Sequence, residues 1–244
     1  MSDNKPFKGV DISVYQGDVN FSILAEHVDF AILRLCTTYY GGIKVDTNFL
    51  KNYTNAKRVG LPVGVYVYSY NTSTSEASAS AEAVVKYLIN NCINLELPVW
   101  YDFEEVSRNK PNLKADNTAI VEAFITHILD CEFKAGLYTF QSFYQQGLLP
   151  DRLKGVDLWI AKWADTPPES LDRDIQIWQY SNSGIVPGIP AVVDLNLCYK
   201  KYWVGSGTEP VSDEYVILSE RVKALEEKHL KYDDIIKKLK EVLL

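Results

Sequence analysis

The sequence predicts an α/β fold in which eight strands close into one barrel. Eight short apolar segments rich in Val, Ile, Tyr, Phe and Trp recur over residues 7–197, and helix-like segments separate the early ones. Buried strands joined by helical crossovers favour a closed parallel barrel over an open sheet. The predicted strands are Phe7–Ser13, Phe30–Thr37, Pro62–Tyr70, Pro98–Glu104, Lys134–Phe140, Leu158–Trp163, Ile175–Ser181 and Ala191–Leu197.

Three helices are expected after early strands. Residues 46–59 begin with Asp46 as the expected N-cap and stop at Gly60. Residues 75–92 are rich in Ala and Glu, and residues 115–131 carry apolar side chains at helical spacing. The helices shorten after the fifth strand, and only a Pro-rich loop follows the sixth. We therefore expect an irregular barrel whose last strands are joined by loops.

The barrel is expected to span residues 1–204, because the composition changes beyond them. Residues 205–212, Gly-Ser-Gly-Thr-Glu-Pro-Val-Ser, are typical of a linker. Residues 213–244 are expected to form an amphipathic helix, since residues 215–243 carry an apolar series in alternating steps of three and four, interrupted at His229. Such a stripe packs either on the barrel or against a second copy. Its narrowness favours a homo-oligomer, although docking to another protein is also open.

Composition and charge narrow the classes of function. The net charge of −7 argues against a uniformly basic nucleic-acid surface, and no segment is long and apolar enough for a membrane span. The polar N-terminus lacks an apolar signal core, so synthesis in the cytoplasm without a signal peptide is expected. Neither a metal ion nor another cofactor is expected. The cysteines are expected to be four buried free thiols: Cys36, Cys92, Cys131 and Cys198.

Acidic side chains at strand ends are the main candidates for chemistry. Asp102 and Glu104 lie two residues apart, so the alternation of a strand places both on one face. Asp11 ends the first apolar segment and Asp194 lies in the last, and these strands are neighbours if the barrel closes. Carboxylates forced together raise each other's pKa, and a protonated acid beside an ionised one suits glycosidic cleavage. The alternative is a set of separate acids in water.

Aromatic side chains supply a second indication. Tyr66, Tyr68 and Tyr70 alternate along the third strand and share a face. Further rings lie in or near other strand ends: Tyr138, Trp163, Trp178 and Tyr180. Because sugar rings have apolar faces that stack on aromatic rings, a wet aromatic cleft with carboxylates suits a polysaccharide. The alternative is that several of these rings, and Trp100, fill the barrel core.

Several short motifs follow one another along residues 7–203. They are Gly9-Val-Asp11-Ile-Ser13 with Gln16-Gly17, Asp46 with Phe49, Gly64-Val-Tyr66, Asp102-Phe-Glu104, Leu158-Trp159-Ile-Ala161, Ile177-Trp178-Gln179-Tyr180-Ser181 with Gly184 and Gly188, and Val193-Asp194-Leu-Asn196. In content and order, these motifs resemble those of the glycoside hydrolase family 25 muramidases, which include many phage endolysins. The resemblance implies an irregular TIM-like barrel of the (β/α)5(β)3 type.

The resemblance also implies an activity, which is hydrolysis of the β-1,4 bonds between N-acetylmuramic acid and N-acetylglucosamine in bacterial peptidoglycan, after release from the cell. Glu104 matches the general acid, and Asp102 matches an acid thought to orient the N-acetyl group or stabilise charge. Asp11 and Asp194 match the remaining active-site acids. Substrate contacts are expected from Tyr66, Tyr68, Tyr138, Trp163, Gln179 and Arg34, the last standing where many relatives carry Lys.

Two other functions stay open at this point. A non-catalytic barrel that binds wall polysaccharide has the same aromatic residues, although the presence of all four acids argues against it. A related hydrolase that cuts chitin-like chains, or the other peptidoglycan linkage, needs the same acids. The second step of the reaction is also open between a carboxylate nucleophile and the substrate's own acetamido group.

Overall fold

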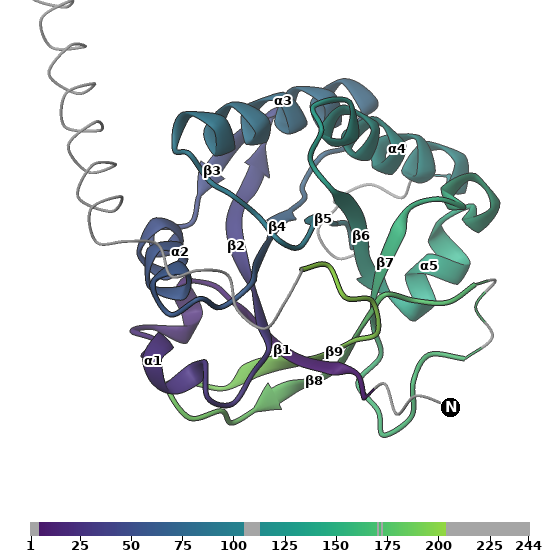
Figure 1. Ribbon diagram of the computed structural model, residues 1–244. Helices are drawn as coiled ribbons and strands as arrows, with labels where there is room; N and C mark the ends of the chain where they lie inside the picture. Colours follow the sequence, from purple (N-terminus) through teal and green to yellow (C-terminus); the bar gives the residue numbers. More distant parts are fainter. Residues whose placement is uncertain (1–4, 105–112, 170, 172, 204–244) are drawn as a thin grey trace, which may run out of the picture.

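The computed structural model describes residues 5–104, 113–169, 171 and 173–203. Its strands are β1 (Phe7–Ile12), β2 (Phe30–Tyr39), β3 (Gly42–Val45), β4 (Val63–Tyr68), β5 (Val99–Asp102), β6 (Ala135–Phe140), β7 (Asp157–Ala161), β8 (Ile177–Gly184) and β9 (Val193–Cys198). Among the described residues, eight of these strands form a ring in the order β1-β9-β8-β7-β6-β5-β4-β2, which a pairing between β1 and β2 closes (Figure 1). Each of the eight predicted strands overlaps one member of this ring.

The last strand of the ring runs against the expected direction. Strands β1, β2 and β4 to β8 pair in parallel, but β9 is antiparallel to both β8 and β1. The prediction of a wholly parallel barrel is therefore wrong for β9. The connection over residues 185–192 is too short for the crossover that a parallel neighbour requires, so the chain returns as a hairpin.

Helices cover the outside of the ring on the side of β2 to β7 (Figure 1). They are α1 (Phe21–Leu24), α2 (Phe49–Arg58), α3 (Thr74–Asn90), α4 (Lys114–Asp130) and α5 (Gln141–Gly147), with short 3-10 turns at Val14–Gln16 and Pro150–Leu153. The three predicted helices are confirmed to within three residues at their ends, and Gly60 follows α2 with a φ of 70°. The expected N-cap Asp46 is wrong, because Asn48 occupies that position.

The apolar core has two parts. One part lies between the strands and the surrounding helices, and the other fills the barrel itself. Inside the barrel, the rings of Trp100 and Trp159 meet edge to face, with centres 5.8 Å apart. Trp203 packs against Phe7 at 5.0 Å near the amino ends of the parallel strands. These rings fill that end of the barrel, and the cavity among the described residues lies toward the carboxyl ends of the parallel strands.

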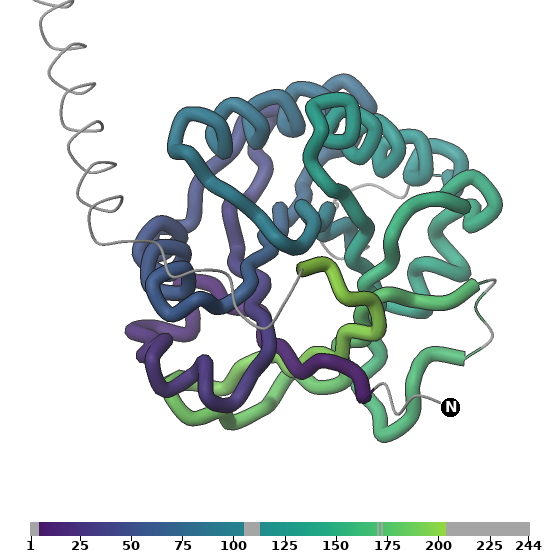
Figure 2. The backbone as a smooth tube through the Cα atoms, viewed as in Figure 1, coloured from purple at the N-terminus to yellow at the C-terminus, as the bar shows by residue number. Residues whose placement is uncertain are grey.

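The two ends of the described chain lie side by side. Strand β1 pairs with β9, so the first and last strands are neighbours as expected; in Figure 2 the purple start of the tube runs beside its green end. The boundary at 204, the expected linker 205–212 and the expected amphipathic helix 213–244 lie outside the described residues. Within the described ranges, every helix is too short or too polar to cross a membrane.

The cysteines are less uniformly buried than expected. All four are free thiols, and Cys36 and Cys198 are buried in strands. Cys131 is half-buried and Cys92 is exposed, so the prediction of burial is wrong for Cys92 and holds only in part for Cys131. Cys92 follows the end of α3 with a φ of 51°, in a turn that faces solvent.

Candidate active site

Four carboxylates reach the same end of the barrel. Asp11 lies near the end of β1, Asp102 is the last residue of β5, and Glu104 follows two positions later. Asp194 lies near the start of β9, and because β9 is antiparallel, its start meets the carboxyl ends of the other strands. Asp11 and Asp194 are direct partners in the pairing of β1 with β9. The reversal of the last strand is thus what brings Asp194 to the other acids.

A cavity of about 440 Å³ lies between these acids. This volume is within the range of small-molecule sites, which combine apolar walls with a few polar groups. Among the described residues that line it, Arg34 is the only one with a positive charge. The lining consists of Asp11, Ser13, Tyr15, Gln16, Arg34, Thr37, Tyr66, Tyr68, Tyr70, Asp102, Glu104, Tyr138, Trp159, Gln179 and Asp194.

Side-chain amides connect the acids to the aromatic wall. Gln179 Nε2 donates to Asp11 Oδ2 at 3.0 Å and to Asp194 Oδ2 at 3.4 Å. Its Oε1 accepts the hydroxyl of Tyr138 at 3.0 Å and the indole N–H of Trp163 at 3.1 Å. Gln179 is 1% exposed, so these bonds fix its orientation. A buried amide therefore sets the positions of two carboxylates.

A second amide supports Asp11. Asn196 Nδ2 donates to Asp11 Oδ2 at 2.8 Å, and Asn196 Oδ1 accepts the indole N–H of Trp159 at 2.8 Å. Asp11 thus receives two amide N–H donors on one oxygen, which favour its charged form. These donors oppose the effect of burial, which is the larger of the two.

Burial and mutual repulsion raise the pKa values of the acids. Removal from water raises the pKa of Asp11 and Asp102 well above the ordinary value, and the neighbouring charges of Asp194 and Glu104, respectively, raise them further. Burial also raises the pKa of Asp194. The pKa of Glu104 is raised to about 7 by burial, and the neighbouring Tyr138 hydroxyl opposes the shift. Glu104 therefore holds its proton over a large part of the acidic range.

One carboxylate oxygen in the cleft has no hydrogen-bond partner. Asp102 Oδ1 is fully buried, yet no group in the described part of the chain bonds to it. An unsatisfied buried acceptor costs about 1–3 kcal/mol. This oxygen is consequently available to an N–H or O–H donor of a ligand.

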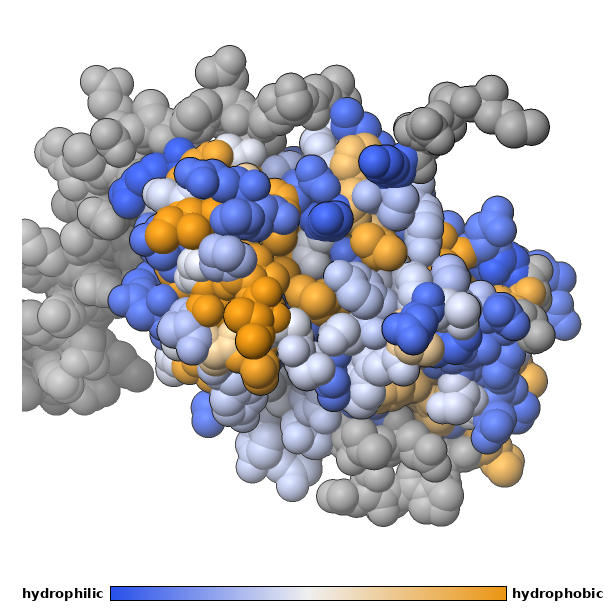
Figure 3. All heavy atoms as spheres, turned by 90° about the horizontal axis from the view of Figure 1, so that it is seen from below, coloured by the Kyte–Doolittle hydropathy of each residue, from blue (hydrophilic) through white to orange (hydrophobic). Residues whose placement is uncertain are grey.

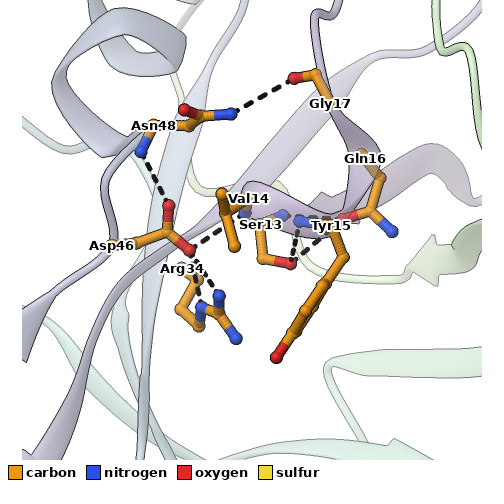
Figure 4. A network of polar contacts seen from close by, with 8 residues as sticks. All are labelled: Ser13, Val14, Tyr15, Gln16, Gly17, Arg34, Asp46 and Asn48. Atoms are coloured by element: carbon orange, nitrogen blue, oxygen red, sulfur yellow. Dashed lines mark hydrogen bonds and ion pairs between the residues drawn. The ribbon is translucent and has the colours of Figure 1, made fainter.

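The positively charged side chain of the cleft, Arg34, is held in place by the buried carboxylate of Asp46 (Figure 4). Arg34 Nε and Nη2 each lie 2.7 Å from Asp46 Oδ2, which also accepts the backbone N–H of Val14 at 3.0 Å. Asp46 Oδ1 accepts the backbone N–H of Asn48 at 2.9 Å. The guanidinium lies 4.9 Å from the ring centre of Tyr15. Asp46 therefore holds both Arg34 and the 13–17 loop in place.

The expected site residues lie at the cleft with one exception. The four acids line the cavity, as do five of the six expected substrate contacts: Tyr66, Tyr68, Tyr138, Gln179 and Arg34. Trp163 is not part of the lining, and its indole N–H donates to Gln179 Oε1. Trp100 lies in the core, as the alternative interpretation of the aromatics had it, and Trp178 is buried.

Several lining residues were not predicted. Trp159 belongs to a matching stretch but is not among the predicted site residues. Its position in the middle of β7, on the inner face, is the feature that could have placed it in the site. Tyr15 and Thr37 had no such signal. Among the described residues, no group of three or more His, Cys, Asp or Glu side chains is arranged to hold a metal ion.

Comparison with known proteins identifies the family. The sequence profile of the glycosyl hydrolases family 25 matches residues 10–189. The chain belongs to this family. No curated protein sequence matches it significantly. The resemblance expected from the motifs is therefore confirmed.

Solved structures of family 25 members have the same fold. A family 25 glycosyl hydrolase from Bacillus anthracis is 27% identical, with a TM-score of 0.67, over 82% of this chain and 92% of that one. The autolysin LytC from Streptococcus pneumoniae is 26% identical, with a TM-score of 0.69, over 79% of this chain. The match spans only 46% of LytC, which has also been solved with a synthetic peptidoglycan ligand.

A phage enzyme shares the fold as well. The catalytic domain of endolysin ply40, from bacteriophage P40 of Listeria monocytogenes, is 24% identical, with a TM-score of 0.66, over 82% of this chain and 97% of that domain.

Proposed function

We propose that the protein is an N-acetylmuramidase, a lysozyme that hydrolyses the β-1,4 bonds from N-acetylmuramic acid to N-acetylglucosamine in bacterial peptidoglycan. The observation that carries this proposal is the gathering of four carboxylates in one cleft, with the pKa of Glu104 raised to about 7. Membership of the glycosyl hydrolases family 25 supports the class of reaction. The peptidoglycan ligand of LytC supports the class of substrate.

Glu104 acts as the proton donor. Its proton passes to the glycosidic oxygen, and the bond from the anomeric carbon to that oxygen breaks with its electron pair on the oxygen. Positive charge then develops on the anomeric carbon, and the carboxyl oxygens of the other cleft acids stabilise it. Water supplies the hydroxyl of the new reducing end and returns a proton to Glu104.

Asp102 orients the substrate. Its unpaired Oδ1 suits the N–H of the substrate's N-acetyl group, because a donor there satisfies an acceptor that is otherwise buried without a partner. Gln179 holds Asp11 and Asp194 in place by hydrogen bonds, and these two acids give the cleft its acidic wall. Arg34 and the rings of the cleft contact the sugar units: Tyr66, Tyr68 and Tyr138.

Product analysis tests the proposal. Purified walls are digested, the new reducing ends are reduced with borohydride, and the products are identified by mass spectrometry. Reduced muramic acid is the expected product. Reduced glucosamine would mean that the other linkage is cut, and the absence of new reducing ends would mean that the barrel binds the wall without cutting it. Either of those results contradicts the proposal. Action on the wall follows release of the protein from the cell in which it is made.

The C-terminal segment is proposed to associate two or more copies. Its apolar series over residues 215–243 supports this, since the stripe has the spacing of a coiled-coil seam. Light scattering of the full chain against a Leu225→Asp and Leu239→Asp double variant tests it. An oligomer that the double substitution converts to a monomer is expected, and equal monomeric masses contradict the proposal.

A further inference from the structure

Two exposed tyrosines lie at the tip of the β2–β3 hairpin, outside the cavity. Tyr39 and Tyr40 are 67% and 83% exposed, and their ring centres lie 4.5 Å apart in an edge-to-face arrangement. Neither ring contributes to the apolar core. A tyrosine ring with one apolar face and one polar tip is typical of binding surfaces.

The backbone at this tip is unfavourable for a bulky residue. Tyr40 and Gly41 have φ values of 46° and 77°, and Tyr39 pairs with Gly42 across the hairpin. Two-residue turns with positive φ at both positions favour Asn-Gly, because a bulky side chain is strained there. A tyrosine kept in a strained position on the surface points to a functional role.

The hairpin tip is held against a helix. A Cβ atom on Gly41 would lie 3.3 Å from the Cβ of Ala79 in α3, which shows how closely the turn approaches this helix. Ser80, also in α3, has its hydroxyl oxygen 3.5 Å from the carbonyl oxygen of Gly42 and donates to Asn71 Oδ1 at 3.1 Å. Figure 1 shows β3 beside α3. The two rings are therefore presented on a fixed support.

An aromatic surface connects the tip with the cleft. Thr37 lines the cavity, and Tyr39 follows it on the same face of β2, about 7 Å further along the strand. Tyr68 and Tyr70 line the cavity with ring centres 5.2 Å apart. The backbone N–H of Tyr70 donates to Thr38 Oγ1 at 2.7 Å, next to Tyr39. The rings at the tip thus continue the wall of the cavity outward.

We infer that Tyr39 and Tyr40 form a platform on which sugar rings of the glycan strand stack beyond the cavity. This inference rests on the proposed function and adds that the enzyme takes long strands rather than isolated short oligosaccharides. The apolar faces of the sugar rings match the exposed tyrosine rings, and their hydroxyls stay in water. Continuity with the cleft favours the same strand that is cut as the occupant.

Binding of strands of two lengths tests the platform. The protein carries Glu104→Gln so that strands stay intact, and the probes are a tetrasaccharide and much longer strands, prepared from purified peptidoglycan and freed of peptides by an amidase. Tyr39→Ser and Tyr40→Asn are compared with Tyr199→Ser, an exposed tyrosine that follows β9 at the opposite end of the barrel. Each substitution at the tip is expected to raise the Kd for long strands about fivefold. The Kd for the tetrasaccharide should change less.

Two substitutions at Tyr40 separate binding from folding. Tyr40→Asn should raise Tm by about 2 °C, because it relieves the strained turn. Tyr40→Phe keeps the ring and should keep the Kd for long strands. The inference is overturned if Tyr39→Ser and Tyr40→Asn bind long strands as tightly as Tyr199→Ser, or if they weaken both probes equally. Failure of the proposed function is seen separately, when the unmodified protein releases no reducing muramic acid from walls.

Discussion

The two ends of the barrel differ in whether their acidic side chains are paired with a cation. At the end away from the cleft, Lys57 pairs with Glu96, and Lys200 lies 2.7 Å from Asp157. Each of these acids has a cation beside it. At the cleft end, four acids face one another, and the cation among the described lining residues, Arg34, is already paired with Asp46.

This difference separates stability from chemistry. A paired charge holds the structure together, whereas buried acids without a cation beside them have raised pKa values and keep their protons to a higher pH than acids in water. The paired end is therefore expected to respond to substitution in its stability, and the cleft end in its activity. The following predictions test that division.

The largest effect is expected at Glu104. Glu104→Gln removes the proton donor while keeping its shape, so kcat/KM should fall by about 10²–10⁴-fold. The measurement is the clearing of a suspension of purified walls, with Glu26→Gln, an exposed acid, as the matched control. A variant that keeps a tenth or more of the original rate would falsify the role of Glu104.

A smaller effect is expected at the paired end. Lys57→Met leaves Glu96 without its cation, so the free energy of unfolding should fall by roughly 3 kcal/mol, as for other broken buried pairs. Lys51→Met is the control. Its pair with Asp18 is exposed, so this substitution should lower the free energy of unfolding by less than about 1 kcal/mol. Urea unfolding measures both. Equal losses in the two variants would remove the proposed contrast, as would a loss of activity in folded Lys57→Met.

The smallest effect is a gain in stability at the cleft. The pKa of Glu104 is raised from 4.5 to about 7 on folding, so its contribution is present at low pH and is lost as pH rises through 7. The change in pKa corresponds to about 3 kcal/mol, and partial access of solvent to Glu104 lowers it, so Glu104→Gln should be about 2 kcal/mol more stable than the unmodified protein at pH 8. At pH 4 the two should be alike. Urea unfolding at both pH values decides, and equal stability at pH 8 argues against the raised pKa.

The sequence predicts the ring because each strand is a short apolar segment, and that signal is local. The direction of β9 cannot be predicted from its apolar segment, because the pattern of apolar residues is the same whether a strand runs parallel or antiparallel to its neighbour. Only the short connection over residues 185–192 indicates the reversal. Strand β3 was missed because it is four residues long and begins with Gly42.

The acids of the site can also be predicted from a local pattern, whereas the positions of other residues that line the cavity depend on contacts with distant parts of the chain. Asp102 and Glu104 follow from alternation along one strand. Tyr15 lies in a 3-10 turn, and its place over Arg34 depends on the bond from Val14 to Asp46, 32 positions away. No pattern in the neighbourhood of Tyr15 indicates that contact. Trp163 is the opposite case, a residue that the sequence places in the site but that does not line the cavity. Its position near a strand end does not indicate that its indole N–H bonds to Gln179.

The most direct test is the titration of Glu104 itself. Carbon-13 NMR of the side-chain carboxyls, with Glu104→Gln to assign the signal, follows its protonation from pH 3 to pH 9. Burial of Glu104 in the cleft predicts a midpoint of about 7, and a parallel loss of kcat/KM above that pH. A midpoint near the ordinary value of 4.5 would contradict the account, because Glu104 would then have no proton to give at neutral pH.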